Sequence, residues 1–235
     1  MRRVVIVQAR MTSTRLPGKV LMDLAGKPLL ERELERLQHA DEVVLAVTTN
    51  PDDDPLVDLA DRLGVRWHRG SEHDVLARYA GAAREASADA IVRVTADCPL
   101  IDPDEVDAVL AALTPDVDYA ANILQRRLPR GLDAEALWRD TLERMDRLAT
   151  SGPAREHVTW FCHTERPDLF VLRSVERPFD AADLRWTVDT EADLELVRRL
   201  YEDGMHLRPL ADIIAHVRAH PELAAINAHV AQKET

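Results

Sequence analysis

The segment Gln8–Leu21, which reads QARMTSTRLPGKVL, has the residue types of an anion-binding loop. It carries Arg10, Arg15 and Lys19, and the first twenty residues hold five basic side chains and no acidic one, although the whole chain has a net charge of -12. The serine, threonine and glycine residues between the cations allow backbone N–H groups to face the same ligand. We therefore expect this loop to bind a polyphosphate.

The loop does not follow either of the common phosphate-binding patterns. GxxxxGK[ST] and GxGxxG are both absent, so a Walker loop and a dinucleotide fingerprint are excluded. Each cation taken alone is equally well explained as an ordinary surface charge. Three of them beside the end of one predicted strand favour a shared ligand.

Two aspartates are candidates for holding a metal ion. Asp97 follows one predicted strand and precedes Cys98, and Asp189 follows another predicted strand far along the chain. Mg²⁺ is usually held by one or two carboxylates, with water and phosphate oxygens completing its octahedron. The pair predicts a Mg²⁺ site, and the alternative that each aspartate only caps a loop or helix stays open.

The segment REHVTWF contains Arg155, Glu156 and His157. His157 could act as a base, but a single histidine beside Trp160 and Phe161 is more often a packed residue with a hydrogen-bond partner. Neither a Ser-His-Asp order nor HExxH occurs. The four tryptophans are too widely spaced to form a stacking platform for bases, and we expect them in the core.

The first half of the chain alternates short apolar runs with helical patterns. Strands are predicted over residues 4–7, 43–47, 65–68 and 91–94, and helices over 28–37, 54–63, 74–86 and from Asp102-Pro103 to about Leu113. This order implies right-handed crossovers and a mainly parallel sheet, in an α/β fold of three layers. Ligands bind such sheets at the carboxyl ends of the strands, so the basic loop and Asp97 should share one rim.

The second half is less regular. A turn at Gly131 is expected to lead into a helix within LPRGLDAEALW, and SGPAREHVTWF is expected to form another. Strands are predicted over 170–174 and 185–188, followed by a helix with Thr190 as its N-cap and Asp193 as the acidic partner in a capping box. We expect a single domain over 1–235, with nucleotide bound by about 1–115 and acceptor binding or dimerisation in about 116–235.

Composition excludes several classes of protein. An isoelectric point near 5.2 argues against a protein that covers nucleic-acid phosphates, and no apolar run approaches the length of a membrane span. Cys98 and Cys162 have no CxxC spacing, so neither a zinc cage nor a disulfide framework is expected. These features predict a cytoplasmic protein with small-molecule partners, with no nucleic-acid polymer and no membrane among its partners.

The motifs, taken together, resemble the cytidylyltransferase family of sugar-acid activation. The most similar branch is the one named for spore coat polysaccharide biosynthesis protein F, and the resemblance runs along most of the chain. It is carried, in order, by QARMTSTRLPGKVL, VTTNPDDD, RGSEHDVLARY, VRVTADCPLIDP, GLDAEAL, REHVT and RWTVDTEADLELVRRLY. The combination of ARxxSxRLPGK, TADCPLID and WTVDT is specific, whereas VDT alone would be weak.

The resemblance implies a GT-A-like, Rossmann-like nucleotidyltransferase fold that uses CTP, depends on Mg²⁺ and releases pyrophosphate. By position, Arg10, Ser13, Arg15 and Lys19 would cradle the triphosphate, with Arg10 and Lys19 as the catalytic cations. Asp97 and Asp189 would hold the metal. The residues implied near base and ribose are Gln8, Ala9, Thr48, Thr49 and Asp74.

The acceptor is less well defined. Relatives that activate sialic acid and 3-deoxy-manno-octulosonate differ in their second half, so they do not indicate the acceptor contacts of this chain. The acceptor contacts predicted here rest on the branch's own motifs and are Glu135, Arg155, Glu156 and His157. Arg155 and the arginines of residues 125–130 suit an acidic acceptor such as a sugar acid, phosphosugar or phosphonate. A solvated surface explains them equally well.

Two other functions stay open from sequence alone. A glycosyltransferase on the same scaffold would use a nucleotide-sugar and a DxD metal motif, which PDDDP at 51–55 formally contains. A non-catalytic nucleotide-binding subunit would keep the pocket without turnover. A homodimer is expected because relatives are often dimers; the amphipathic segment Leu194–Tyr201 could form its contact, although such segments are more often core.

Overall fold

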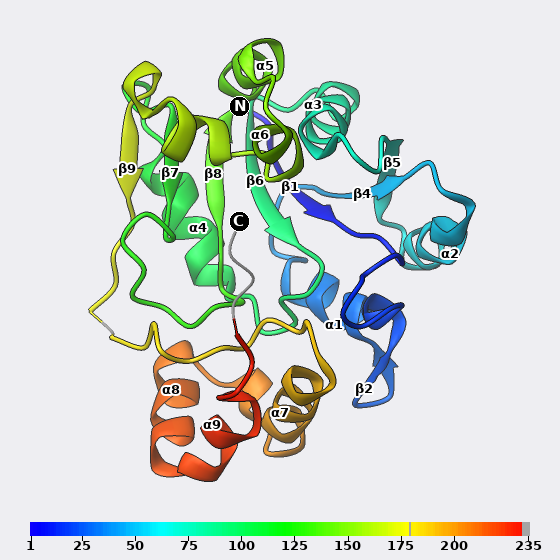
Figure 1. Ribbon diagram of the computed structural model, residues 1–235, viewed down its shortest axis with the longest axis vertical. Coiled ribbons are helices and arrows are strands. Elements are labelled where there is room, and N and C mark those ends of the chain that lie inside the picture. Colours follow the sequence, from blue (N-terminus) through cyan, green and yellow to red (C-terminus); the bar gives the residue numbers. More distant parts are fainter. Residues whose placement is uncertain (179, 232–235) are drawn as a thin grey trace.

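The computed structural model describes residues 1–178 and 180–231 and shows an α/β fold built on a seven-stranded sheet (Figure 1). The strand order is β5-β4-β1-β6-β8-β7-β9. These strands are β1 (Arg3–Gln8), β4 (Val43–Thr48), β5 (Arg66–Gly70), β6 (Ala90–Thr95), β7 (Tyr119–Ala121), β8 (Glu135–Trp138) and β9 (Leu172–Ser174). A small antiparallel pair, β2 (Asp23–Leu24) and β3 (Lys27–Pro28), lies outside the sheet.

The sheet is mainly parallel. β1 pairs in parallel with β4 and β6, and β4 pairs in parallel with β5. β8 is antiparallel to both of its neighbours, β6 and β7, and β7 pairs in parallel with β9. Within the described residues, β8 is therefore the one strand of this sheet that runs against the others.

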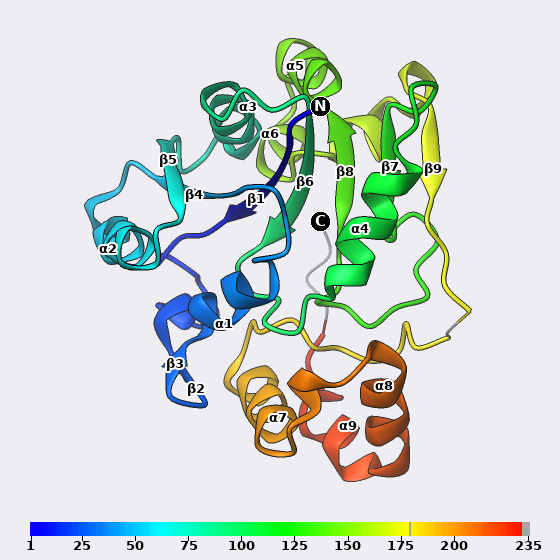
Figure 2. The same ribbon diagram turned by 180° about the vertical axis from the view of Figure 1, so that it is seen from behind.

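Helices cover both faces of the sheet, which gives three layers (Figures 1 and 2). The helices are α1 (Leu29–Arg36), α2 (Asp54–Leu63), α3 (Val75–Glu85), α4 (Pro103–Ala112), α5 (Arg139–Leu148), α6 (Gly152–Glu156), α7 (Glu191–Glu202), α8 (Leu210–Ala219) and α9 (Pro221–Asn227). Helices α1, α2 and α4 pack on one face and α3, α5 and α6 on the other.

The sequence of β1 explains this arrangement. Side chains alternate between the faces of a strand, and an apolar run buried on both sides is typical of a parallel sheet. Val5 and Val7 enter the core formed with α1, α2 and α4, whereas Val4 and Ile6 enter the core formed with α3, α5 and α6. All four side chains are at most 1% exposed, so this strand is fully enclosed.

The helices α7 to α9 form a third cluster beyond the carboxyl ends of the central strands (Figure 2). Its core includes Trp186 and Val188, which precede α7, together with Leu24 from the region after β1. The cluster thus brings the segment around Asp189 to the same edge of the sheet as the basic loop. This is the rim at which parallel sheets bind ligands.

The α/β fold class and the mainly parallel sheet are confirmed. The helix predicted over 54–63 has those bounds, and the other helices and strands predicted in the first half occur with ends shifted by one or two residues. Asp102 caps α4 by accepting the N–H of Asp104, with Pro103 as the first helical residue. Local signals were sufficient here because these elements alternate regularly.

Three predictions for the second half are wrong. The segment after Gly131 forms strand β8 rather than a helix, because residues 135–138 pair with both β6 and β7. Residues 185–188 form no strand; Arg185 makes an isolated bridge to Arg130. The helix expected through residues 151–161 ends at Glu156, and a π-helical turn, Phe161–Glu165, follows it.

Two expectations about buried positions have different outcomes. Trp67 is 37% exposed on an edge strand, so the expectation that all the tryptophans are core residues is wrong for it. Leu194, Leu196, Val197, Leu200 and Tyr201 of α7 are buried in the third cluster, so their apolar face is core. No helix of the described residues has the length and apolar composition needed to cross a bilayer.

Gly131 provides a stability test of the segment that carries Asp189. Its φ is +101°, and a Cβ there would lie 2.4 Å from the backbone nitrogen of Thr187. We expect Gly131→Ala to lower the free energy of unfolding by about 3 kcal/mol or more, because backbone strain and a backbone clash add. Urea unfolding followed by circular dichroism measures this.

Gly26→Ala is the matched control. Gly26 also has a positive φ, +82°, but no atom of the described residues lies within 4 Å of the place that a Cβ would take. The substitution should cost only about 1 kcal/mol. Equal losses for the two variants would show that close packing against Thr187 contributes nothing.

Candidate active site

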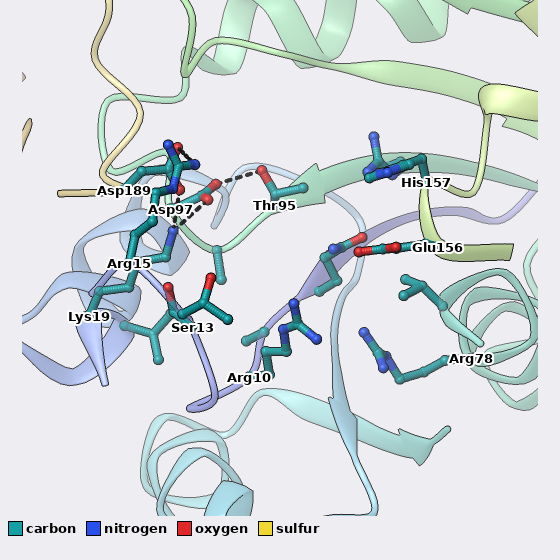
Figure 3. Close-up of a pocket in the computed structure, with 17 residues that line it drawn as sticks. Arg10, Ser13, Arg15, Lys19, Arg78, Thr95, Asp97, Glu156, His157 and Asp189 are labelled. Carbon is teal, nitrogen blue, oxygen red and sulfur yellow. Dashed lines mark hydrogen bonds and ion pairs between the residues drawn. The ribbon is translucent and has the colours of Figure 1, made fainter. Parts of the chain in front are cut away.

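An open cavity of ≈ 240 Å³ lies at the carboxyl ends of β1 and β6 (Figure 3). Of the residues predicted for the site, those that line it are Gln8, Ala9, Arg10, Ser13, Arg15, Lys19, Asp97, Glu156, His157 and Asp189. Those that do not line it are Thr48, Thr49, Asp74, Glu135 and Arg155. Residues from four separate segments of the chain thus meet in one cavity.

The basic loop after β1 is held in a defined shape by backbone contacts. The N–H of Met11 donates to Asp53 Oδ1 at 2.7 Å, and the carbonyl of Met11 accepts from Ser13 and Gly18. A short 3₁₀ helix, Lys19–Leu21, then places Lys19 at the rim. These contacts within the chain hold the loop in one shape, which lowers the entropic cost of binding a ligand.

Lys19 is the centre of the charged end of the cavity. Its Nζ donates to Asp97 Oδ2 at 2.8 Å, to Asp189 Oδ1 at 2.9 Å and to the carbonyl oxygen of Val188 at 2.7 Å. Arg15 binds the second oxygen of Asp189 at 2.7 Å, and Arg185 binds that oxygen as well. Two carboxylates that are far apart in the sequence are thus held together by cations.

This arrangement shifts the ionisation of its members. Burial alone would raise the pKa of Asp97, but the charge and hydrogen bond of Lys19 lower it overall. Burial likewise would lower the pKa of Lys19, but Asp97 and Asp189 raise it overall. Both groups are therefore charged at neutral pH.

Asp189 is positioned by the start of α7, not by the end of a strand as predicted. Thr190 and Asp193 form the predicted capping box. Asp193 is 1% exposed, and its carboxylate accepts the backbone N–H groups of Asp189 and Thr190 and the side chains of Arg185 and Asn227. The N-cap prediction is confirmed, and the cap fixes the backbone that carries Asp189.

The turn that carries Asp97 is held by Glu33, a residue that sequence reasoning missed. Glu33 on α1 is fully buried, and its Oε2 accepts the N–H of Cys98 at 2.9 Å. Burial, and then the charge of Asp97, raise the pKa of Glu33 well above its usual value. Thr95 adds a hydrogen bond from its hydroxyl to Asp97 Oδ1 at 2.7 Å.

Three residues predicted near base and ribose do not line the cavity. Thr48 is buried and donates its N–H and its hydroxyl to the carboxylate of Asp53, which also holds the loop after β1. Thr49 is exposed. Asp74 caps α3 by accepting the N–H of Ala77 at 2.9 Å. Thr48 and Asp74 therefore shape the loops that flank the cavity.

Two residues predicted to contact the acceptor are engaged elsewhere. Glu135 is 2% exposed and accepts from Arg93, Tyr119 and Thr159. Arg155 pairs with Asp74 at 2.6 Å and with Asp146 at 2.8 Å, and so joins α6 to the start of α3. These ion pairs explain why neither side chain reaches the cavity.

Seven residues that the sequence did not single out by role also line the cavity. Three are apolar, Val20, Val75 and Ala96, and four are polar, Thr14, Arg78, Arg93 and Thr95. Thr95 precedes Asp97 by two residues, so its place at the strand end was available from the sequence. Arg78 and Arg93 had no such signal, because an arginine inside a helix or strand is usually a surface residue.

The residues present fit a divalent cation that arrives with phosphate. The carboxylate oxygens of Asp97 and Asp189 both bind one cationic atom, the Nζ of Lys19, so they are close enough to share a cation. In residues 1–178 and 180–231, no cluster of three or more His, Cys, Asp or Glu is arranged to hold a metal. Two carboxylates suit Mg²⁺, which keeps waters and takes substrate oxygens as its remaining ligands.

Comparison with known proteins gives consistent matches. A sequence model described as cytidylyltransferase matches residues 4–205. The chain is 33% identical over 235 residues to the spore coat polysaccharide biosynthesis protein SpsF of Bacillus subtilis, covering 93% of this chain and 95% of that protein. It is 37% identical over 126 residues to a 3-deoxy-manno-octulosonate cytidylyltransferase of Chloroherpeton thalassium, covering 52% of this chain and 48% of that one.

The fold has a solved counterpart over its whole length. A cytidylyltransferase structure from Leptospira borgpetersenii superposes with a TM-score of 0.91 at 29% identity, covering 100% of both chains. The match to the Chloroherpeton enzyme covers only about half of each chain, whereas the Bacillus and Leptospira proteins match along nearly all of it.

Removal of Lys19 should reverse the local pH dependence of stability. In the unchanged protein the pKa of Asp97 is lowered, so its ionised carboxylate stabilises the fold at neutral pH. This contribution to the free energy of unfolding is lost only as the pH falls below about 4. In Lys19→Met the partly buried carboxylate of Asp97 has lost its ammonium partner, which should cost about 3 kcal/mol at pH 7. That deficit should shrink by about 1 kcal/mol per pH unit from pH 7 to 5, as a proton replaces the lost cation.

Urea unfolding of both proteins at pH 7, 6 and 5 measures the deficit. Lys27→Met is the control, because Lys27 pairs with Glu31 and Glu35 at the surface, with 40% of its side chain exposed. Its curve should run parallel to that of the unchanged protein. A parallel curve for Lys19→Met would show that Lys19 does not neutralise Asp97.

Proposed function

Because this chain belongs to the cytidylyltransferase family, we propose that it transfers CMP from CTP to an acidic sugar and releases pyrophosphate. The enzyme is a nucleotidyltransferase. The observation that supports this proposal most directly is the convergence of Arg10, Arg15 and Lys19 with Asp97 and Asp189 in one cavity. The product would be a CMP-activated sugar for the synthesis of a surface polysaccharide.

The reaction is a displacement at phosphorus. An oxygen of the acceptor attacks the α-phosphorus of CTP, a new phosphorus–oxygen bond forms, and the bond to the β-phosphate breaks, so that pyrophosphate leaves. Negative charge moves onto the leaving group, and positioning together with cationic stabilisation provides most of the rate enhancement in such reactions.

The residues of the basic loop have distinct places in this scheme. Arg10 and Lys19 face the cavity, and in the proposal they stabilise the charge on the α-phosphate and the departing pyrophosphate. Arg15 and Ser13 hold the outer phosphates. Arg15 pairs with Asp189, but Lys19 and Arg185 pair with the same carboxylate, so Arg15 can change partner without leaving it unpaired.

Asp97 and Asp189 are the proposed ligands of Mg²⁺. When bound, the metal supplies Lewis-acid stabilisation of phosphate charge. The chain's own contribution is to hold both carboxylates ionised and in place, through the capping box of α7 and the turn between Thr95 and Cys98. The positive charge of Lys19 offsets the repulsion between the carboxylates of Asp97 and Asp189.

Glu156 and His157 are proposed to contact the acceptor. They follow one another at the end of α6 and line the cavity opposite the loop that carries Arg10 (Figure 3). A carboxylate and an imidazole can together accept from and donate to sugar hydroxyls. Glu135 holds Thr159, two residues beyond His157, so we propose a positioning role for it.

The glycosyltransferase alternative loses its sequence support. Its DxD motif would be Asp52–Asp54, but Asp53 is buried against Thr48 and Met11, and Asp54 pairs with Arg69. None of the three lines the cavity. A triphosphate therefore fits the observed cations better than a nucleotide-sugar held through that motif.

The function is tested by pyrophosphate release from CTP and Mg²⁺ with a panel of sugar acids, phosphosugars and phosphonates. Release that depends on one acidic acceptor is the expected result. Saturable binding of a nucleotide-sugar with no binding of CTP would favour a glycosyltransferase. CTP binding without turnover on any acceptor would favour a non-catalytic subunit.

Substitution of the central pair should reduce the rate. Lys19→Ala and Asp97→Ala should each lower kcat/KM for CTP by about a hundredfold, since each removes a charge that acts on the phosphates or their metal. Lys27→Ala, a surface cation on the short β3 strand, is the control and should keep full activity. Normal turnover by either site variant would refute its assigned role.

Metal dependence has its own test. EDTA should abolish pyrophosphate release, and added Mg²⁺ should restore it in the unchanged enzyme. Asp189→Asn should need a higher Mg²⁺ concentration for half-maximal rate, because the amide oxygen carries no charge. Full activity in EDTA would show that Asp97 and Asp189 serve only to hold Lys19.

A further inference from the structure

Some residues that line the cavity carry buried polar atoms without a hydrogen-bond partner. Eight buried side-chain nitrogen or oxygen atoms of the described residues have no hydrogen-bond partner, and three of them belong to residues that line this cavity: Gln8 Oε1, Arg78 Nε and Arg93 Nε. Buried polar atoms without partners destabilise a fold. Their concentration in one cavity therefore points to a ligand that completes them.

Arg78 is the least satisfied of these residues. It lies on α3, is 2% exposed and makes one side-chain hydrogen bond within the described residues, from Nη1 to the carbonyl oxygen of Ser71. It has no ion pair among residues 1–178 and 180–231, whereas Arg93 pairs with Glu135. A guanidinium has five N–H donors, so most of those of Arg78 are without a partner in this part of the chain.

The position of the Arg78 side chain is fixed by packing. A Cβ at Gly70 would lie 2.8 Å from Arg78 Cγ, so the absence of a side chain at Gly70 leaves room for the aliphatic part of the arginine. Burial is the main reason that the pKa of Arg78 is lowered. Such a rigidly held, dehydrated donor group is suited to recognising one particular ligand edge.

The surroundings of Arg78 are suited to binding a flat ring with a polar edge. Ala9 and Val75 line the same cavity and are 4% and 5% exposed, so they offer small apolar surfaces. Figure 3 shows Arg78, Glu156 and His157 toward one end of the cavity, Asp97 and Asp189 at the other end, and Arg10 between them. The nucleotide's base can therefore lie beside Arg78 while its phosphates reach Lys19.

We propose that Arg78 reads the pyrimidine base of the nucleotide and makes the site prefer cytosine over uracil. The inference rests on the proposed function, because it assumes that the cavity binds a nucleoside triphosphate. Cytosine presents two adjacent acceptors, O2 and N3, and an amino group at C4. Uracil carries a hydrogen on N3, which opposes a guanidinium because that group can only donate.

Gln8 supplies the complementary acceptor. Its Oε1 is buried without a partner among the described residues and can accept from the amino group of cytosine, which uracil lacks. A site built to make hydrogen bonds rejects a close analogue that leaves those bonds unmade. The base is assigned to Arg78 because the unpartnered donor of Arg78 and the unpartnered acceptor of Gln8 line one cavity, and cytosine offers both acceptors and a donor along one edge.

The test is the dissociation constant of CTP and of UTP, each with Mg²⁺ and without acceptor, measured by isothermal titration calorimetry. The unchanged protein should prefer CTP by about tenfold or more, and Arg78→Met should reduce the preference to within about threefold by weakening CTP. Arg84→Met is the matched control, since Arg84 is an exposed residue of the same helix. It should keep the full preference.

Arg78→Lys keeps the positive charge but loses the adjacent donors, and it should also lose the preference for CTP. If Arg78→Met does not fold, Arg78→Lys tests the proposal instead. The ratio of the dissociation constants of CTP and UTP does not depend on the folded fraction of a sample. A normal CTP to UTP ratio in either Arg78 variant would overturn the proposal. So would unchanged nucleotide binding with a raised KM for the acceptor alone, which would assign Arg78 to the acceptor.

The proposed function fails separately from this inference. If the unchanged protein binds neither CTP nor UTP, both ideas are wrong. If it binds CTP in preference to UTP and Arg78→Met does the same, only the role of Arg78 is wrong.

Discussion

The ammonium group of Lys19, held between the carboxylates of Asp97 and Asp189, is the interaction on which the site depends. It joins the loop after β1 to the turn after β6 and to the segment before α7. Asp97 in that turn is 78 residues from Lys19 in the sequence, and Asp189 in that segment is 170 residues from it. Without a cation there, two carboxylates would repel each other in a poorly hydrated place. The same two carboxylates that the lysine neutralises are the ones proposed to hold a nucleotide-bound metal.

Around this centre, the molecule separates the charges that hold the fold from those available to a ligand. Glu135 and Arg155 belong to the first group, since both are committed to ion pairs outside the cavity. Arg10 belongs to the second: its closest carboxylate, Glu72, is 4.0 Å away, and its side chain is 42% exposed. The cavity lining has five cationic and three anionic side chains, although the net charge of the whole chain is -12.

Several elements of the fold meet around the cavity that is proposed to bind the nucleotide and the acceptor. Parallel strands bring the loops after β1 and β6 to one rim, and the helices α3 and α6, which pack together on one face of the sheet, form adjacent walls beside it. One wall carries Arg78 and the other carries Glu156 and His157. The antiparallel strand β8 places Glu135 beside Arg93 of β6, and this pair links the sheet to the α6 wall through Thr159.

The sequence by itself determined the alternating elements of the first half, the basic loop, the two aspartates and the capping box at Thr190, because each depends on residues close together in the chain. Only the tertiary structure decided that residues 135–138 form a strand, that Glu135 and Arg155 are bound elsewhere, and that Arg78 faces the cavity. These outcomes depend on partners far away in sequence: Arg155 and Asp74, for example, are 81 residues apart. Local patterns carry no information about such pairings, since burial and charge compensation are settled only when the layers pack.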